Sequence, residues 1–162
     1  MSELRRYLLP GLCVLALILA LHTMTLASAP PASLPVESVE IVTAGGETHA
    51  FEAYLADTPE ARGRGLMWVT RLESRQGMLF DFEEPRRVGM WMKNTPLSLD
   101  MLFIDEHGVI VHIERRTRPY SRNVIDSGTV VRAVLEINGG LSSQLGIAPG
   151  DRVVHRLFPA TR

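Results

Sequence analysis

Short stretches of alternating or continuous apolar residues, separated by glycine, proline, asparagine and aspartate, run through most of the chain after residue 35. This pattern is typical of short β-strands joined by turns. The first two stretches flank Gly45 and Gly46 and predict a β-hairpin, because glycine accepts the positive φ of tight turns. In chain order, the predicted strands are residues 36–43, 48–55, 78–82, 88–93, 100–105, 109–115, 129–137 and 151–158.

Two short helices are expected to interrupt these strands. Thr58, Pro59 and Glu60 follow the order of an N-cap residue, a first-turn proline and an acid near the positive end of the helix dipole, so a helix is expected from Thr58 to about residue 67. A second one is expected over residues 141–145. About eight short strands with one or two short helices predict a mainly β (α+β) fold, either a compact β-barrel or a β-sandwich.

The first 29 residues follow a different pattern. Arg5 and Arg6 precede an uncharged apolar run over residues 7–21, and small residues follow from Ala27. This order is that of a secretory signal peptide, and the arginines keep the preceding end in the cytoplasm. The apolar run is shorter than the roughly 20 residues of a spanning helix, but it can be extended without adding a full charge. Residues 1–29 are therefore expected to be a signal peptide or an N-terminal membrane anchor, and both alternatives stay open.

The segment after the leader divides into a linker and one domain. Prolines at three of six positions give residues 30–35 the composition of a linker, and residues 36–162 are long enough for a single globular domain. We expect this domain to be exported to the periplasm or another extracytoplasmic space. It would be tethered to the inner membrane if the leader is not cleaved.

Charge and cysteine content limit the partners and the kinds of site that are expected for the domain. The chain has 17 basic and 18 acidic residues, so no broad cationic field suggests a nucleic-acid partner, and membrane contact is expected only through the N-terminal segment. Cys13, the only cysteine, lies in the leader, which removes disulfides and cysteine chemistry from the domain. No metal site or cofactor is expected, because the histidines are scattered, and no hydrolase elbow, HExxH or Walker motif is present.

Several separate motifs occur in a specific order. They are TPEAR with RGLM at residues 58–67, GMLFDF at 77–82, WMKNT at 91–95, LDM with FID at 99–105, LE with a later glycine at 135–139, and GD at 150–151. Together they resemble the uncharacterised bacterial and archaeal family called domain of unknown function 192, over roughly residues 36 to 158. The resemblance implies a compact β-rich fold and frequent export. It implies no established reaction, ligand or catalytic residue.

The densest of these motifs supplies most of the candidate site. In a strand over residues 88–93 alternate side chains share a face, so Trp91 and Lys93 would stand side by side, with Asn94 and Asp100 at the following turn. Trp91 could wall a pocket, Lys93 could supply charge and Asn94 a paired donor and acceptor. In the alternative, structural interpretation, Trp91 fills the core, Lys93 pairs with Asp100 and Asn94 caps a turn.

Two more residues complete the set. Arg64 could bring a guanidinium to the same region from the first helix, or it could be a surface residue beside a helix-ending glycine. Glu136 is a carboxylate within an apolar strand, and it either faces outward or pairs with Arg64 or Lys93.

These residues favour an exported envelope protein that binds a small polar or anionic molecule, or a partner protein, through Arg64, Trp91, Lys93, Asn94, Asp100 and Glu136. An enzyme is less favoured, and it would be a hydrolase or lyase that uses Lys93 with Asp100 or Glu136. A structural or assembly factor is the third alternative.

Overall fold

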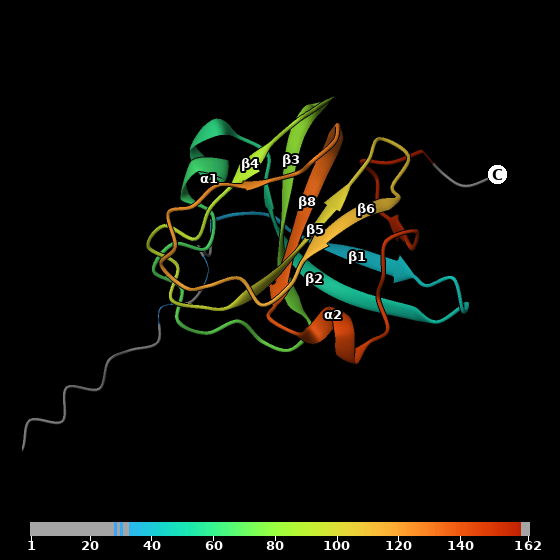
Figure 1. Ribbon diagram of the computed structural model, residues 1–162, viewed down its shortest axis with the longest axis horizontal. Coiled ribbons are helices and arrows are strands. Elements are labelled where there is room, and N and C mark those ends of the chain that lie inside the picture. The colour runs from blue at the N-terminus through green and yellow to red at the C-terminus, as the bar shows by residue number, and fades with distance from the viewer. Residues whose placement is uncertain (1–27, 29, 31–32, 160–162) are drawn as a thin grey trace, which may run out of the picture.

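The computed structural model describes residues 28, 30 and 33–159, and these form a mainly β fold around one strongly curled sheet (Figure 1). The sheet has seven strands in the order β6-β5-β8-β3-β2-β1-β9, and a second sheet pairs β4 with β7. The strands are β1 (Val36–Val42), β2 (Thr48–Ala56), β3 (Gln76–Arg86), β4 (Gly89–Met90), β5 (Leu99–Ile104), β6 (Ile110–Glu114), β7 (Ile125–Asp126), β8 (Val131–Asn138) and β9 (Arg152–Val154).

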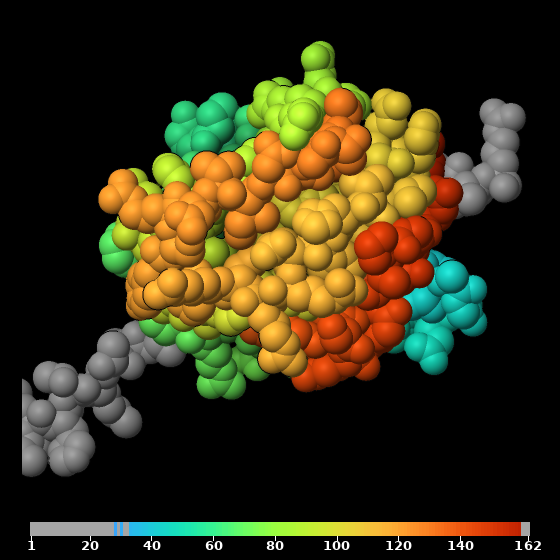
Figure 2. Space-filling model, in the orientation of Figure 1, coloured from blue at the N-terminus to red at the C-terminus, as the bar shows by residue number. Residues whose placement is uncertain are grey.

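The sheet curls into a half-barrel, which confirms the predicted mainly β class. Its two edges meet at one corner, where Val109 bridges Arg152 and the backbone N–H of Ile110 donates to the carbonyl of Asp151 over 2.9 Å. The sheet is antiparallel except between β2 and β3, which run parallel because helix α1 (Pro59–Arg64) carries the chain across. Figure 2 shows one face of the molecule covered by β6 and the segment leading to β8, with the C-terminal segment beside them.

Both faces of the central strands are buried. One face carries the core that includes Phe51, Leu102 and Leu135, and helix α2 (Leu141–Gln144) packs beside it. The other face carries Met78, Phe80, Met101 and Phe103 and is covered by the turn after α1 and the segment around β4. Alternate residues of a strand point to opposite faces, so β5 is buried along its whole length.

The predicted hairpin and the presence of both predicted helices are confirmed, but α1 ends at Arg64 and not near residue 67, because the chain turns at Gly65 with a φ of 50°. β1 and β2 pair in register from Val36 with Tyr54 to Val42 with Thr48. The Thr58 hydroxyl accepts from the N–H of Ala61 at the start of α1, as an N-cap residue should.

The structure corrects several strand boundaries. The expected strand over 88–93 is reduced to Gly89–Met90, because the chain turns at Asn94, which has a φ of 56°. The short strand β7 brings the strands of the described residues to nine, where about eight were expected. The strand expected over 151–158 ends at Val154.

The predicted leader, residues 1–29, and part of the predicted linker at 30–35 lie outside the described residues. Within the described part of the chain, no helix combines the length and apolar character that crossing a membrane requires.

Candidate functional site

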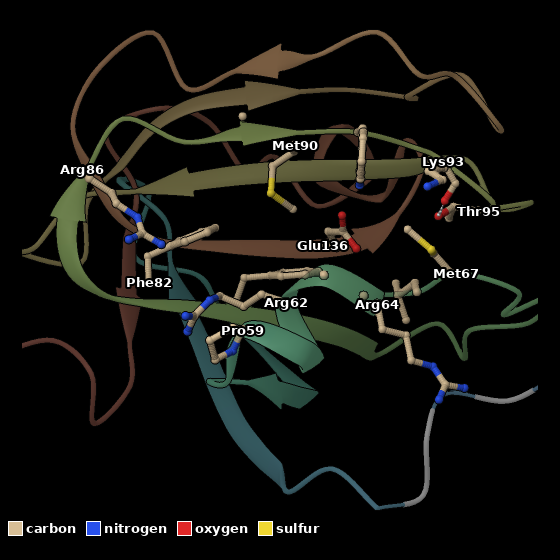
Figure 3. A pocket seen from close by; sticks show the side chains of 16 residues that line it. Pro59, Arg62, Arg64, Met67, Phe82, Arg86, Met90, Lys93, Thr95 and Glu136 are labelled. Carbon is tan, nitrogen blue, oxygen red and sulfur yellow. Dashed lines mark hydrogen bonds between the residues drawn. The ribbon is translucent and has the colours of Figure 1, made fainter.

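A cavity of about 370 Å³ opens on the α1 side of the sheet. Its walls come from α1 and the turn that follows it, the later part of β3, and the segment that begins at β4, and its floor includes Glu136 of β8. Figure 3 places Glu136 between Met90 and α1, with Lys93 and Thr95 toward one end and Phe82 and Arg86 toward the other. Arg64 extends outward from the rim. Segments distant in the sequence thus meet at one hollow.

The end of helix α1 shapes this hollow. Gly65 follows the helix with a φ of 50°, and a Cβ at this position would lie 3.2 Å from the ring of Phe80. Glycine therefore lets the chain turn sharply while resting on the sheet. The turn is then fixed to the opposite wall, because the N–H of Trp68 donates to the carbonyl of Asn94 over 2.8 Å.

Three cations line the cavity without a carboxylate partner in the described part of the chain, namely Arg64, Arg86 and Lys93. The ammonium of Lys93 lies 5.2 Å from the centre of the Trp91 ring, and the guanidinium of Arg86 lies 5.3 Å from that of Phe82. Cation–π contacts hold these side chains without neutralising their charge. The predicted neighbourhood of Trp91 and Lys93 is therefore found, but Trp91 is 45% exposed and does not fill the core.

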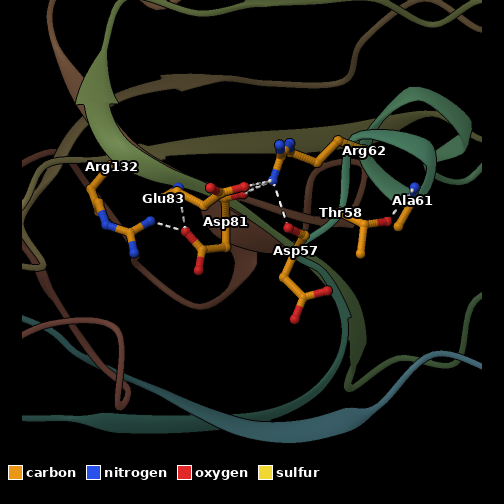
Figure 4. Close-up of polar contacts among 7 residues, drawn as sticks. All are labelled: Asp57, Thr58, Ala61, Arg62, Asp81, Glu83 and Arg132. Atoms are coloured by element: carbon orange, nitrogen blue, oxygen red, sulfur yellow. Dashed lines mark hydrogen bonds and ion pairs between the residues drawn. The ribbon is translucent and has the colours of Figure 1, made fainter.

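Arg62 lines the same cavity, but its guanidinium already has partners within the protein. Its guanidinium donates to the carbonyls of Asp57 and Asp81 and forms an ion pair with Glu83 (Figure 4). Arg132 forms an ion pair with the carboxylate of Asp81 from the far side. These contacts fasten α1 to β3, so Arg62 has a structural role that Arg64, Arg86 and Lys93 do not share.

Glu136 is a buried carboxyl group at the floor of the cavity. It is only 3% exposed, and its register neighbours on β3 and β5 are Met78 and Met101, both fully buried. No hydrogen bond or ion pair to its side chain is found within residues 33–159. Burial raises the pKa of Glu136 to about 8, because its charged form loses the solvation of water and gains no partner. The predicted pairing with Arg64 or Lys93 is not formed, although all three groups line one cavity.

Asp100 does not line the cavity. Its carboxylate accepts from the N–H groups of Arg116, Gly140 and Ser142, and from the Ser142 hydroxyl, over 2.6 to 3.0 Å. The carboxylate therefore joins β5 to the loop at Arg116 and to the start of α2, and it has no ion pair with Lys93. Asp100 therefore does not meet Lys93 in a common pocket, as the binding interpretation expected. It also does not form the ion pair with Lys93 that the structural interpretation expected.

Asn94 lies behind the cavity wall. Its side-chain amide donates to the Met67 sulfur at 3.8 Å, and Met67 itself lines the cavity. Asn94 thus shapes the turn, as the structural interpretation expected, and does not face the hollow.

Arg86 and Phe82 are the main site residues that sequence reasoning missed. Simple alternation along β3 places Phe80, Phe82 and Arg86 on one face, which is a signal that could have found them. That signal is weakened because Glu83 has a φ of 66° and the pairing with β8 shifts between Asp81 and Arg86. Among the described residues, no group of three or more His, Cys, Asp or Glu side chains is placed to hold a metal ion.

The described part of the chain is therefore a small β-rich half-barrel with a cation-lined cavity beside one short helix. The chain belongs to the uncharacterized ACR family, domain of unknown function 192, which it matches over residues 40–155. No curated protein matches the chain.

Two solved structures resemble it closely. A protein from Sinorhizobium meliloti 1021, provisionally described as a transcription regulator, is 46% identical, with 77% of this chain and 97% of that chain covered and a TM-score of 0.75. A protein of unknown function from Novosphingobium aromaticivorans DSM 12444 is 35% identical, with 79% and 91% covered and a TM-score of 0.74.

Proposed function

We propose that the protein binds a small molecule that carries an anionic group on a partly apolar body. The observation that carries this proposal is the cavity in which Lys93, Arg86 and Arg64 have no carboxylate partner in the described chain. An anion that enters would supply the missing partner, and charge-assisted hydrogen bonds to such groups are stronger than neutral ones.

The remaining walls support a ligand with an apolar part. Phe80, Phe82, Met67 and Met90 line the hollow. Aromatic and methionine side chains accept flat or irregular apolar groups, and a few polar groups then fix the orientation of the ligand. The cavity of about 370 Å³ is large enough for a molecule of one ring and a short polar chain.

We further propose that the domain works outside the cytoplasm, on the basis of the leader pattern in residues 1–29. The Sinorhizobium protein is provisionally described as a transcription regulator. For this chain we propose no nucleic-acid partner, because its 17 basic residues are balanced by 18 acidic ones.

Titration calorimetry with phenyl phosphate, an anion on an aromatic ring, tests the binding proposal. The expected result is saturable binding that weakens about tenfold in Lys93→Gln, since one charge-assisted hydrogen bond contributes about 1.5 kcal/mol. Arg86→Gln should weaken binding similarly and Arg64→Gln less, because Arg64 points outward. Arg122→Gln is the matched control, an exposed arginine outside the cavity. Absence of binding, or equal affinity in all variants, would contradict the proposal.

One observation favours a second candidate, an acid–base enzyme of the hydrolase or lyase type. Lys93 and Glu136 line the same cavity, and Glu136 is a buried carboxyl with a pKa raised to about 8 by burial. Phosphorus NMR of phenyl phosphate incubated with the protein distinguishes a binding protein from an enzyme. A binding protein leaves the ester intact, whereas a hydrolase at this site consumes water and releases phenol and phosphate, in a manner that Lys93→Gln and Glu136→Gln both abolish.

A further inference from the structure

We propose that the ligand also carries a protonated amine, which Glu136 holds at the floor of the cavity, so that the site recognises a zwitterion. The chemical class is a small molecule with an ammonium group and a carboxylate or phosphate group, such as a free amino acid or an amino-alcohol phosphate. This inference rests on the proposed function, because it assigns the second end of the same ligand.

The first step is that the fold makes no use of Glu136. It is 3% exposed, stands between Met78 and Met101 in the sheet, and has no side-chain partner within residues 33–159. A buried carboxyl without a partner is destabilising by several kcal/mol relative to an apolar side chain of similar size. Asp100 shows the contrast, since four hydrogen bonds satisfy its buried carboxylate.

The second step is that Glu136 faces the hollow. Figure 3 shows its carboxyl directed into the cavity between Met90 and α1, and it is the only acidic side chain among the lining residues. A ligand that fills the cavity therefore meets this group.

The third step concerns the sign of the ligand's charge at each end. A simple anion would meet Lys93 or Arg86, which lie toward opposite ends of the cavity, but would leave Glu136 with at most one hydrogen bond. A simple cation would pass three uncompensated positive groups before it reached the floor. Only a molecule with both charges gives a partner to Glu136 and to a rim cation at once, and ion pairs in a water-poor cavity are stronger than in bulk solvent.

This arrangement has a consequence for protons. In the empty cavity at neutral pH Glu136 holds a proton, since burial raises its pKa to about 8. An ammonium group beside the carboxyl favours the ionised form and lowers that pKa. Binding of a zwitterion at neutral pH therefore releases a proton from Glu136, whereas binding of a simple anion does not.

The test uses three probes with the same ring and chain, namely L-phenylalanine, 3-phenylpropanoate and 2-phenylethylamine. Calorimetry at neutral pH should show that phenylalanine binds at least tenfold more tightly than either of the others. In Glu136→Gln, which keeps the size of the side chain, the advantage of phenylalanine over 3-phenylpropanoate should disappear while the affinity for 3-phenylpropanoate is kept. Titration in two buffers of different ionisation enthalpy should show proton release for phenylalanine with the native protein only.

A second pair, O-phosphoethanolamine and ethyl phosphate, repeats the comparison with phosphate as the anionic group. The pair in which the added amine raises the affinity by the larger factor indicates whether carboxylate or phosphate fits the site better. The inference is overturned if the amine adds no affinity in either pair, or if its benefit survives Glu136→Gln. Binding of 3-phenylpropanoate, ethyl phosphate or phenyl phosphate in that case leaves the proposed function standing. If none of these anions binds, the proposed function fails as well. If Glu136→Gln does not fold, the proton release measured with the native protein tests the inference. Release on binding of phenylalanine supports it, and binding without release overturns it.

Discussion

At the scale of single residues, Glu136 and Asp100 show that a buried carboxyl group can take two different roles. Both are buried carboxyl groups on neighbouring strands, β8 and β5. Asp100 accepts four hydrogen bonds, whereas Glu136 faces an open cavity and accepts none from the residues that the structure describes. A carboxylate that accepts several N–H bonds stabilises the fold, and one that accepts none is available for a ligand.

The free energy of unfolding should depend on pH through Glu136. Its pKa is about 8 when folded and near 4.5 when unfolded, so between these values the folded state holds one proton more. The native protein should therefore lose roughly 1.4 kcal/mol of stability from this group for each pH unit of rise across that window. Urea unfolding at several pH values should show Glu136→Gln gaining stability relative to the native protein as pH rises toward 8. A pH-independent difference would mean that Glu136 is ionised or paired in the folded state.

Asp100→Asn should destabilise the domain without changing ligand affinity. The amide loses the charge that four donors share, and we expect a loss of about 3 kcal/mol in urea unfolding. Because Asp100 lies outside the cavity, the folded variant should bind phenyl phosphate as the native protein does. Glu106→Gln, an exposed change on the loop between β5 and β6, is the control and should alter neither quantity. If Asp100→Asn lowers the affinity for phenyl phosphate without lowering stability, Asp100 contributes to the binding site.

At the scale of elements, the hairpin, α1 and α2 are predictable because their signals are local. Turn glycines, an N-cap and first-turn proline, and strict apolar alternation each specify a conformation within a few residues. The predicted strand over 88–93 fails because Lys93 and Asn94 form a turn, which is held by the N–H of Thr95 donating to Met92. The two-residue strand β7 is missed because it is too short to show a period.

The site was less predictable because it depends on pairing register. Asp100 pairs with Ile137, whereas Met101 pairs with Glu136. Alternate residues face opposite sides, so Asp100 and Glu136 point to different faces of the sheet. The sequence motif places Asp100 near Lys93 along the chain, but only the register reveals that the sheet separates Asp100 from the cavity.

Thr58→Ala tests whether the cap of α1 positions the cavity wall. The Thr58 hydroxyl accepts from Ala61, and its loss should lower the free energy of unfolding by about 1 kcal/mol. Since α1 lines the cavity, affinity for phenyl phosphate should fall slightly as well. Ser143→Ala in α2, where the described residues give the hydroxyl no hydrogen bond, should leave both unchanged. Equal stability of the two variants in urea would show that the cap does not contribute.

At the scale of the whole molecule, the family match over residues 40–155 covers most of the described fold. The crystallised Sinorhizobium chain corresponds to 77% of this chain and is itself covered over 97% of its length. The chain enters the domain at Ser28, whose N–H and carbonyl hydrogen-bond with Thr70, next to the turn that follows α1. Any anchor formed by the leader would thus hold the domain from the side of that turn.

Cell fractionation tests the proposed export. The chain beginning at Met1 should leave the cytosol, whereas a chain beginning at Ser28 should remain there, because only the former has the basic start and apolar run. On a Western blot, a mature protein that migrates with the Ser28 chain and is released by osmotic shock indicates a cleaved signal peptide. A protein that migrates with the full chain and sediments with membranes indicates an anchor, for which the 15-residue apolar run must extend to about residue 27. Recovery of the full chain in the cytosol would contradict export, and with it the extracytoplasmic setting proposed for the ligand.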